Sequence, residues 1–116
     1  MTASESESFI SAEKLSWNDL GGNVQRKILG FDGQLMMVHV QFKKDSIGSL
    51  HQHPHRQVTF VKRGSFTVEI DGVKNFLKEG DSFFVAPNLL HGCVALEDGE
   101  LIDIFTPVRE DFITKG

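Results

Sequence analysis

Hydrophobic and polar residues alternate along most of this chain with the period of two that is typical of β-strands. The alternation is longest over residues 35–42, where Met36, Val38, Val40 and Phe42 share one face. Further segments rich in β-branched and aromatic residues predict strands at 24–29, 58–62, 65–70, 73–77, 82–85, 90–96 and 100–106. Because no long segment has the period of a helix, the pattern predicts an all-β sandwich or barrel of antiparallel strands.

The segments between these strands carry turn signals. Asp71-Gly72 predicts a tight hairpin, because both central positions of such a turn need a positive φ. Residues 43–49 are interpreted as a polar loop and residues 97–100 as a solvent-exposed turn. Residues 107–113 fit either a short helix or a capping strand, and the sequence leaves both open.

Composition narrows the classes of function. A chain of 116 residues suits one domain, and its net charge of -4 counts against nucleic-acid binding, which needs a basic face. No apolar run approaches the roughly 20 residues of a membrane span, so we expect no membrane association and a cytoplasmic protein. Cys93 is the only cysteine, which excludes a disulfide within the chain. Residues 1–8 are rich in Ser and Glu and predict a disordered tail before a single domain at 9–116.

Four of the five histidines predict a metal site. His51, His53 and His55 stand at every second position, and His91 lies downstream. Side chains two positions apart in an extended segment point the same way, and imidazole is a common ligand of transition metals. Gln57 has the same parity, so we expect it to face the same side of the strand.

These residues belong to two spaced motifs. The first contains Gly48, His51, His53, Gln57 and Gly64, and the second contains Gly80, Asp81, Pro87 and His91. Together they resemble the two signature motifs of the cupin superfamily, although Gly48 lies closer to the histidines than the usual glycine. The resemblance implies an all-β cupin fold, a double-stranded β-helix or jelly-roll barrel, in which three histidines and a glutamate hold one divalent metal. The implied ligands here are His51, His53 and His91, with Gln57 at the position of the glutamate.

The glutamine at the usual position of the glutamate has a chemical consequence. A neutral amide oxygen leaves more positive charge on a metal than a carboxylate does, so the metal would be a stronger Lewis acid. The KdgF-type cupins carry this glutamine, and the similarity extends over residues 15–22, 25–30, 51–57, 80–83 and 103–112. It implies metal-dependent ring opening of 4,5-unsaturated monouronates, sugar acids from pectin or alginate, to the linear keto-uronate. Nickel or zinc is the favoured metal, with manganese, iron, cobalt and copper open, and a homodimer is expected because small cupins commonly pair.

The last predicted strand supplies the candidate catalytic residues. Asp103 and Phe105 share a face with Leu101, so an acid and an aromatic ring would point into the barrel together. A carboxylate there needs a metal, a substrate or a cation to offset its desolvation. Asp103 is predicted to move a proton, Arg109 to hold the substrate carboxylate or to pair with Asp103, and Phe105 to lie against the sugar. Arg26 and Gln41 are further candidates for lining the pocket.

Several alternatives stay open at this stage. His55 is interpreted as a support for a ligand, whereas His39 fits a pocket wall or a hydrogen-bonded interior position equally well. Cys93 has the parity of His91, but packing is favoured over metal binding for a single cysteine. The rival functions are a non-catalytic cupin that binds a sugar or small acid and an iron-dependent dioxygenase.

Overall fold

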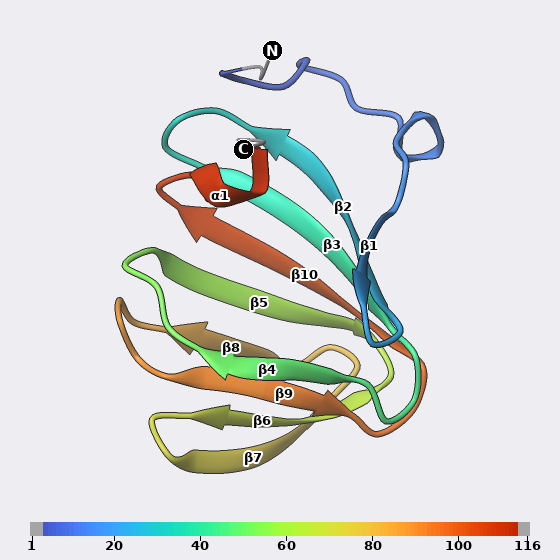
Figure 1. The fold of residues 1–116 in the computed structure, drawn as a ribbon, viewed down its shortest axis with the longest axis vertical. Helices are drawn as coiled ribbons and strands as arrows, with labels where there is room; N and C mark the ends of the chain where they lie inside the picture. Colours follow the sequence, from blue (N-terminus) through green and yellow to red (C-terminus); the bar gives the residue numbers. More distant parts are fainter. Residues whose placement is uncertain (1–3, 114–116) are drawn as a thin grey trace.

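The computed structural model describes residues 4–113, which form two antiparallel sheets packed face to face (Figure 1). The six-stranded sheet has the order β1-β2-β3-β10-β5-β8, and the four-stranded sheet has the order β4-β9-β6-β7. The strands are β1 (Asn18–Gly21), β2 (Val24–Phe31), β3 (Met36–Phe42), β4 (Ile47–His51), β5 (Arg56–Arg63), β6 (Ser65–Ile70), β7 (Val73–Lys78), β8 (Ser82–Val85), β9 (His91–Ala95) and β10 (Gly99–Thr106). Two short helices, η1 (Ala12–Lys14) and α1 (Glu110–Ile113), precede and follow them. The predicted jelly-roll fold is confirmed.

The alternation in β3 determines which side of the larger sheet is the core. Met36, Val38, Val40 and Phe42 are each at most 8% exposed, whereas Met37 between them is 38% exposed. The ring of Phe42 meets that of Phe66 from the smaller sheet edge-on, with centroids 5.2 Å apart. The hydrophobic core therefore lies between the sheets, as the period of two predicts.

The predicted hairpin at Asp71-Gly72 is also confirmed. The two residues have φ of 51° and 82°, and Ile70 pairs with Val73 at the start of the β6–β7 ladder. A positive φ at both positions is the backbone of the tight turn that matches the twist of paired strands.

Two interpretations of the connecting segments are corrected. Part of the predicted polar loop at 43–49 is strand, because β4 begins at Ile47 and pairs with Val94 of β9. The predicted solvent-exposed turn at 97–100 is wrong for Glu100, which is 8% exposed and lies inside β10. The open alternative at the C-terminal end is resolved in favour of a helix, α1.

The N-terminal segment runs along the larger sheet. Ser6 accepts a hydrogen bond on Oγ from the backbone N–H of Phe31 and donates its own backbone N–H to the Phe31 carbonyl. Residues 1–3 of the predicted tail lie outside the described residues. Among residues 4–113, no helix combines the length and the apolar character needed to cross a membrane.

Candidate metal centre

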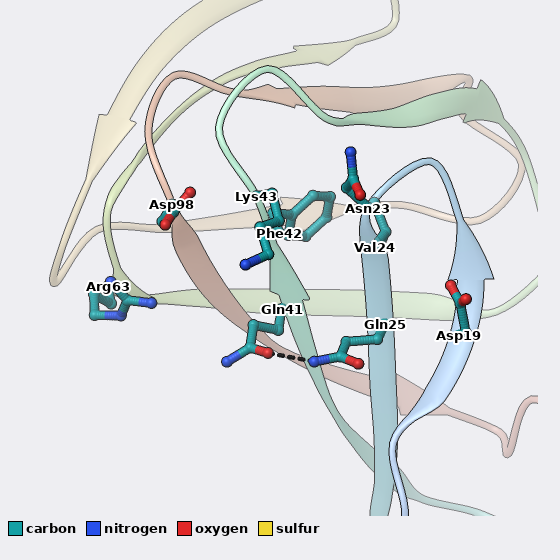
Figure 2. A pocket seen from close by; sticks show the side chains of 9 residues that line it. All are labelled: Asp19, Asn23, Val24, Gln25, Gln41, Phe42, Lys43, Arg63 and Asp98. Carbon is teal, nitrogen blue, oxygen red and sulfur yellow. Dashed lines mark hydrogen bonds between the residues drawn. The ribbon is translucent and has the colours of Figure 1, made fainter.

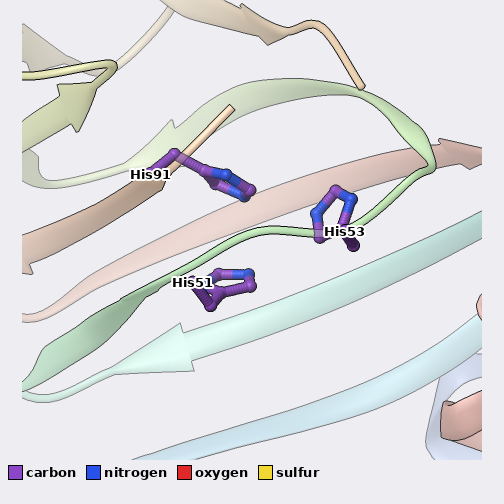
Figure 3. Close-up of side chains that lie close together, drawn as sticks. All are labelled: His51, His53 and His91. Atoms are coloured by element: carbon purple, nitrogen blue, oxygen red, sulfur yellow. The ribbon is translucent and has the colours of Figure 1, made fainter. Parts of the chain in front are cut away.

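Three histidines meet between the two sheets (Figure 3). His51 ends β4, His91 begins β9, and the two residues are direct partners in the ladder between these strands. The strands approach closely at Gly92, where an added Cβ would lie 2.6 Å from the carbonyl oxygen of Gly48, so only glycine fits. His53 reaches the same point from the loop after β4, and the ligand atoms of the three residues lie within 4.8 Å of one another.

The backbone fixes the tautomer of each ring. Nδ1 of His51 lies 2.7 Å from the carbonyl oxygen of Ser49, Nδ1 of His53 3.1 Å from that of His55, and Nδ1 of His91 2.9 Å from that of Leu89. A carbonyl only accepts, so each Nδ1 must carry the proton and donate it. Each Nε2 is then left with a lone pair, which is the form of imidazole that binds a metal.

Gln57 adds a fourth electron-pair donor to the three histidines, and a bound cation would remove the repulsion between their lone pairs. Its Oε1 lies 3.0 Å from Nε2 of His53 and 3.2 Å from Nε2 of His91, so lone pairs face one another. Burial lowers the pKa of both rings, that of His91 to about 4, so protonation at neutral pH does not relieve the conflict. Three imidazole nitrogens and an amide oxygen suit a divalent transition metal, and the residues present therefore fit such an ion.

The orientation of the Gln57 amide is set from its other end. Its Nε2 donates to Oγ1 of Thr59 at 2.9 Å, and the Thr59 hydroxyl donates to Oδ1 of Asp103 at 2.6 Å. Because the nitrogen faces these two acceptors, the oxygen must face the histidines. Thr59 thereby connects the candidate metal ligands to Asp103.

A cavity of about 240 Å³ opens beside the histidines. His51, His91, Gln57, Asp103, Phe105, Arg109, Arg26, Cys93 and Phe112 are among the residues that line it. Its volume lies below the roughly 300–1,000 Å³ of pockets for drug-sized ligands, which favours a ligand of the size of one sugar. Apart from these polar groups the walls are largely aliphatic and aromatic, so charged groups inside are poorly solvated.

The apolar surroundings of the cavity change the pKa of the Asp103 carboxyl. Burial raises the pKa of its carboxyl to about 6, although the Thr59 hydrogen bond and the positive charge of Arg109 oppose the rise. Among the described residues, no Arg or Lys nitrogen forms an ion pair with it, so the structural pairing with Arg26 or Arg109 that the sequence left open is not formed. A carboxyl with a pKa near neutrality can both accept and release a proton.

Arg109 and Phe105 line the same cavity as this carboxyl. Phe105 is 2% exposed, and the Cζ of Arg109 lies 5.1 Å from its ring centroid. Arg109 also donates two hydrogen bonds to Asp111, from Nε at 3.0 Å and from Nη2 at 2.8 Å. The three predicted catalytic side chains thus share one cavity with His51 and His91.

Other candidates fall outside the metal-binding set. His55 supports His53 through its carbonyl oxygen, and its own Nδ1 is buried with no hydrogen-bond partner among residues 4–113. Cys93 lines the cavity, but burial raises the pKa of its thiol to about 12, which disfavours the thiolate that a metal would need. His39 lies on the other face of the sheet, where it hydrogen-bonds to Glu100 and packs edge-on against Trp17.

The prediction that Gln41 lines the pocket is wrong. Its side chain points to the outer face of the larger sheet, because it stands one position from Val40, which faces the core. There it pairs with Gln25 in a separate polar groove of about 300 Å³ that Asp19, Arg63 and Asp98 also line (Figure 2). Among the described residues, this groove holds no group of three potential metal ligands.

Sequence reasoning missed several residues of the site. Thr59 has the parity of Gln57 and could have been found from that pattern, because both point inward from β5. Phe112 and Asp111 carried no such signal, since the structure of residues 107–113 was left open. Phe112 lines the cavity because α1 packs against it, and Asp111 contributes through its hydrogen bonds to Arg109.

Comparisons with known proteins agree with this geometry. The cupin-domain family profile matches residues 38–105. The chain is 45% identical over 103 residues to the pectin degradation protein KdgF of Dickeya dadantii (strain 3937), an alignment that covers 87% of this chain and 94% of that protein.

Two solved structures share both fold and sequence. An RmlC-like cupin from Shewanella frigidimarina NCIMB 400 has a TM-score of 0.94 at 45% identity, covering 96% of this chain and all of the other (100%). KdgF from Halomonas sp. has a TM-score of 0.89 at 39% identity, covering 93% of this chain and 100% of that chain. The resemblance predicted from the two motifs is confirmed, and the chain belongs to the cupin family, with KdgF proteins among its relatives.

Proposed function

We propose that this protein catalyses the metal-dependent ring opening of 4,5-unsaturated monouronates to linear keto-uronates, an isomerase-like reaction. The observation that carries the proposal is that His51, His91 and Gln57 line one cavity with Asp103 and Arg109, and that the ligand atoms of His51, His53 and His91 lie within 4.8 Å of one another. The relatives named for KdgF and for pectin degradation support the choice of a uronate. A divalent metal, with nickel or zinc favoured, is the cofactor.

The reaction needs one proton to move and no atom to be gained or lost. The anomeric hydroxyl loses its proton, the bond between the anomeric carbon and the ring oxygen breaks to leave an aldehyde and an enolate, and the enolate becomes the ketone as carbon 4 gains a proton. Asp103 is the group placed to take up the first proton and to return one, because its pKa of about 6 lies near neutrality.

The other residues hold the reactants in place. His51, His53, His91 and Gln57 would bind the metal, which when bound supplies a Lewis acid that polarises an oxygen of the sugar. Phe105 offers a buried ring for the sugar face, and Arg109 provides positive charge beside the substrate carboxylate. The aliphatic and aromatic walls limit the access of water to the reacting sugar.

The test is elemental analysis of the native protein combined with an assay on an unsaturated monouronate. We expect about one divalent metal per chain and loss of the ultraviolet absorbance of the conjugated enol ether. Tight binding of the sugar without decay would replace the proposal with a binding protein. Iron together with oxygen consumption would replace it with a dioxygenase, and neither metal nor decay would reject it.

We further propose that the single domain at 9–116 forms a cytoplasmic homodimer through the outer face of its larger sheet. Met37, Val58, Phe60 and Phe84 are 38–58% exposed there, and Val58 is a direct neighbour of both Phe84 and Ile104. A contiguous apolar face is uncommon on a monomer, and a second copy fits because the apolar side chains of two identical faces can bury one another. Phe60→Glu should therefore convert a dimer into a monomer in light scattering, and a monomeric wild-type protein would contradict the proposal.

A further inference from the structure

Two arginines stack on the same aromatic ring, that of Phe112, where β2 and α1 border the cavity. The Cζ of Arg26 lies 3.6 Å from the ring centroid of Phe112, and the Cζ of Arg109 lies 4.2 Å from it. Arg26 reaches this position because it pairs with Val40 in the β2–β3 ladder and so faces the core side of the sheet. Both guanidinium groups thus border the space in which a ligand would lie.

The charges of the two arginines are balanced very differently. Arg109 is 9% exposed, and Asp111 holds it through two hydrogen bonds. Arg26 forms neither an ion pair nor a side-chain hydrogen bond with any other residue in the described part of the chain, 4–113, and its Nε is buried without a partner. The positive charge that the cavity leaves uncompensated is therefore that of Arg26.

A half-buried cation without a counter-ion is costly to the folded protein. Burial and the nearby charge of Arg109 both lower the pKa of Arg26, but a guanidinium stays protonated at any physiological pH. The cost falls when an anion occupies the cavity. A carboxylate matches the planar fork of the guanidinium, which offers it two parallel hydrogen bonds.

Asp103 does not fill this role from within the protein. Its Oδ1 is already engaged by the hydroxyl of Thr59 and lies 3.5 Å from the Gln57 amide nitrogen. Its effect on Arg26 is the smallest of the four causes that act on the pKa of that arginine. Since no carboxylate within residues 4–113 pairs with Arg26, an anionic ligand in the cavity is the partner that we consider.

We propose that Arg26 is the carboxylate-docking residue of the cavity and determines its preference for sugar acids over neutral sugars. Arg109, which Asp111 holds in place, lies beside it and contributes charge without having to give up its own partner. This inference takes the class of ligand, a sugar acid, from the proposed function. It goes beyond that function by naming the residue that selects the ligand.

The experiment compares a uronic acid with its neutral ester. Binding of galacturonic acid and of its methyl ester to the metal-loaded protein is measured by calorimetry for the wild type, for Arg26→Gln and for Lys27→Gln. Lys27 is the matched control, because it carries the same charge on the same strand but pairs with His39 on the outer face, where it hydrogen-bonds to the carbonyl of Ala12. Arg26→Lys keeps the charge and loses the fork, which also guards against a variant that fails to fold.

We expect the wild type to bind the acid more tightly than the ester. Arg26→Gln should weaken binding of the acid by roughly 10- to 100-fold, as expected for a charged hydrogen-bond pair, and leave the ester unchanged. The affinity of Arg26→Lys for the acid should lie between those of the wild type and Arg26→Gln, and the affinity of Lys27→Gln should match that of the wild type. Equal losses for acid and ester, or an unchanged affinity for the acid in Arg26→Gln, would overturn the assignment.

This test is separate from that of the proposed function. Galacturonic acid is saturated at carbons 4 and 5, so its binding is measured without ring opening. A protein that shows the acid preference through Arg26 but fails to consume an unsaturated monouronate would refute the proposed reaction and support this inference.

Discussion

Asp103 and Glu100 are carboxylates three residues apart on the same strand, β10, and they have opposite electrostatic surroundings. An odd spacing places them on opposite faces of the sheet. Glu100 on the outer face accepts hydrogen bonds from Arg63 and His39 and lies 3.6 Å from the amine of Lys62. Asp103 on the inner face accepts a hydrogen bond from Thr59 at 2.6 Å and a long one from Gln57 at 3.5 Å, and it forms no ion pair within residues 4–113.

The pKa values express the same contrast. Burial acts to raise the pKa of both groups, but the donors around Glu100 outweigh it and lower its pKa to about 2. The donors around Asp103 do not, and its pKa rises to about 6. The outer carboxylate therefore contributes to the stability of the sheet, whereas the inner one is left able to exchange a proton. Perturbed carboxyl groups in a cavity are typical of functional sites.

Replacing the inner carboxylate should have the largest effect. We expect Asp103→Asn to lower turnover of an unsaturated monouronate by about 10²- to 10⁴-fold, because the amide cannot carry the proton. Metal content should stay at the wild-type level, and the melting temperature should not fall, because a buried charge without a cation is removed. Turnover by this variant within twofold of the wild type would remove Asp103 from the mechanism.

Replacing the outer carboxylate should affect stability instead. We expect Glu100→Gln to lower the free energy of unfolding at pH 7 by roughly 1–3 kcal/mol, because its charged hydrogen bonds are weakened. Turnover per folded molecule should be unchanged, and urea unfolding measures the loss.

The pH dependence of this loss has a defined sign. The folded-state pKa of Glu100 is lowered from 4.5 to about 2, so its contribution is complete above pH 4.5 and disappears as the pH falls towards 2. The difference in stability between the wild type and Glu100→Gln should therefore shrink over that range. A constant difference from pH 7 down to pH 2 would show that Glu100 acts through packing rather than charge.

The smallest effect is expected at Thr59, which links the inner carboxylate to the candidate metal ligands. Thr59→Val keeps the shape of the side chain but removes the hydroxyl that connects Gln57 and Asp103. Turnover should fall roughly 3- to 10-fold, because the two lost hydrogen bonds act on the reaction only by positioning Gln57 and Asp103, and Thr59→Ser should restore it. Equal turnover by the Val and Ser variants would show that this hydroxyl has no part in positioning the two residues.

The sequence predicted what depends on local periodicity and failed where distant segments meet. The alternation through Met36 to Phe42 was enough to predict the buried face of β3, and the parity of Gln57 placed it towards the histidines. Glu100 was misread because it ends an acidic run, and its partners Arg63 and His39 come from two other strands.

The arginines at the end of the cavity illustrate the same limit. The sequence predicts Arg109 as a group that holds a carboxylate, and in the structure Asp111, two residues further on, already engages its Nε and Nη2. Arg26 is separated from Phe112 by most of the chain, so only the folded sheet shows that the two stack at 3.6 Å. Periodicity predicts which face a side chain occupies, and it does not predict which charge there is left without a partner.

The central claim is that the inner face of the sheet holds a metal beside Asp103. Its most direct test is an anomalous difference map from crystals of the metal-loaded protein, with data collected on both sides of the absorption edge of the metal found by elemental analysis. The account predicts one strong peak per chain, bounded by Nε2 of His51, His53 and His91 and by Oε1 of Gln57. A peak elsewhere, or an empty centre with the Gln57 nitrogen turned towards the histidines, would contradict it.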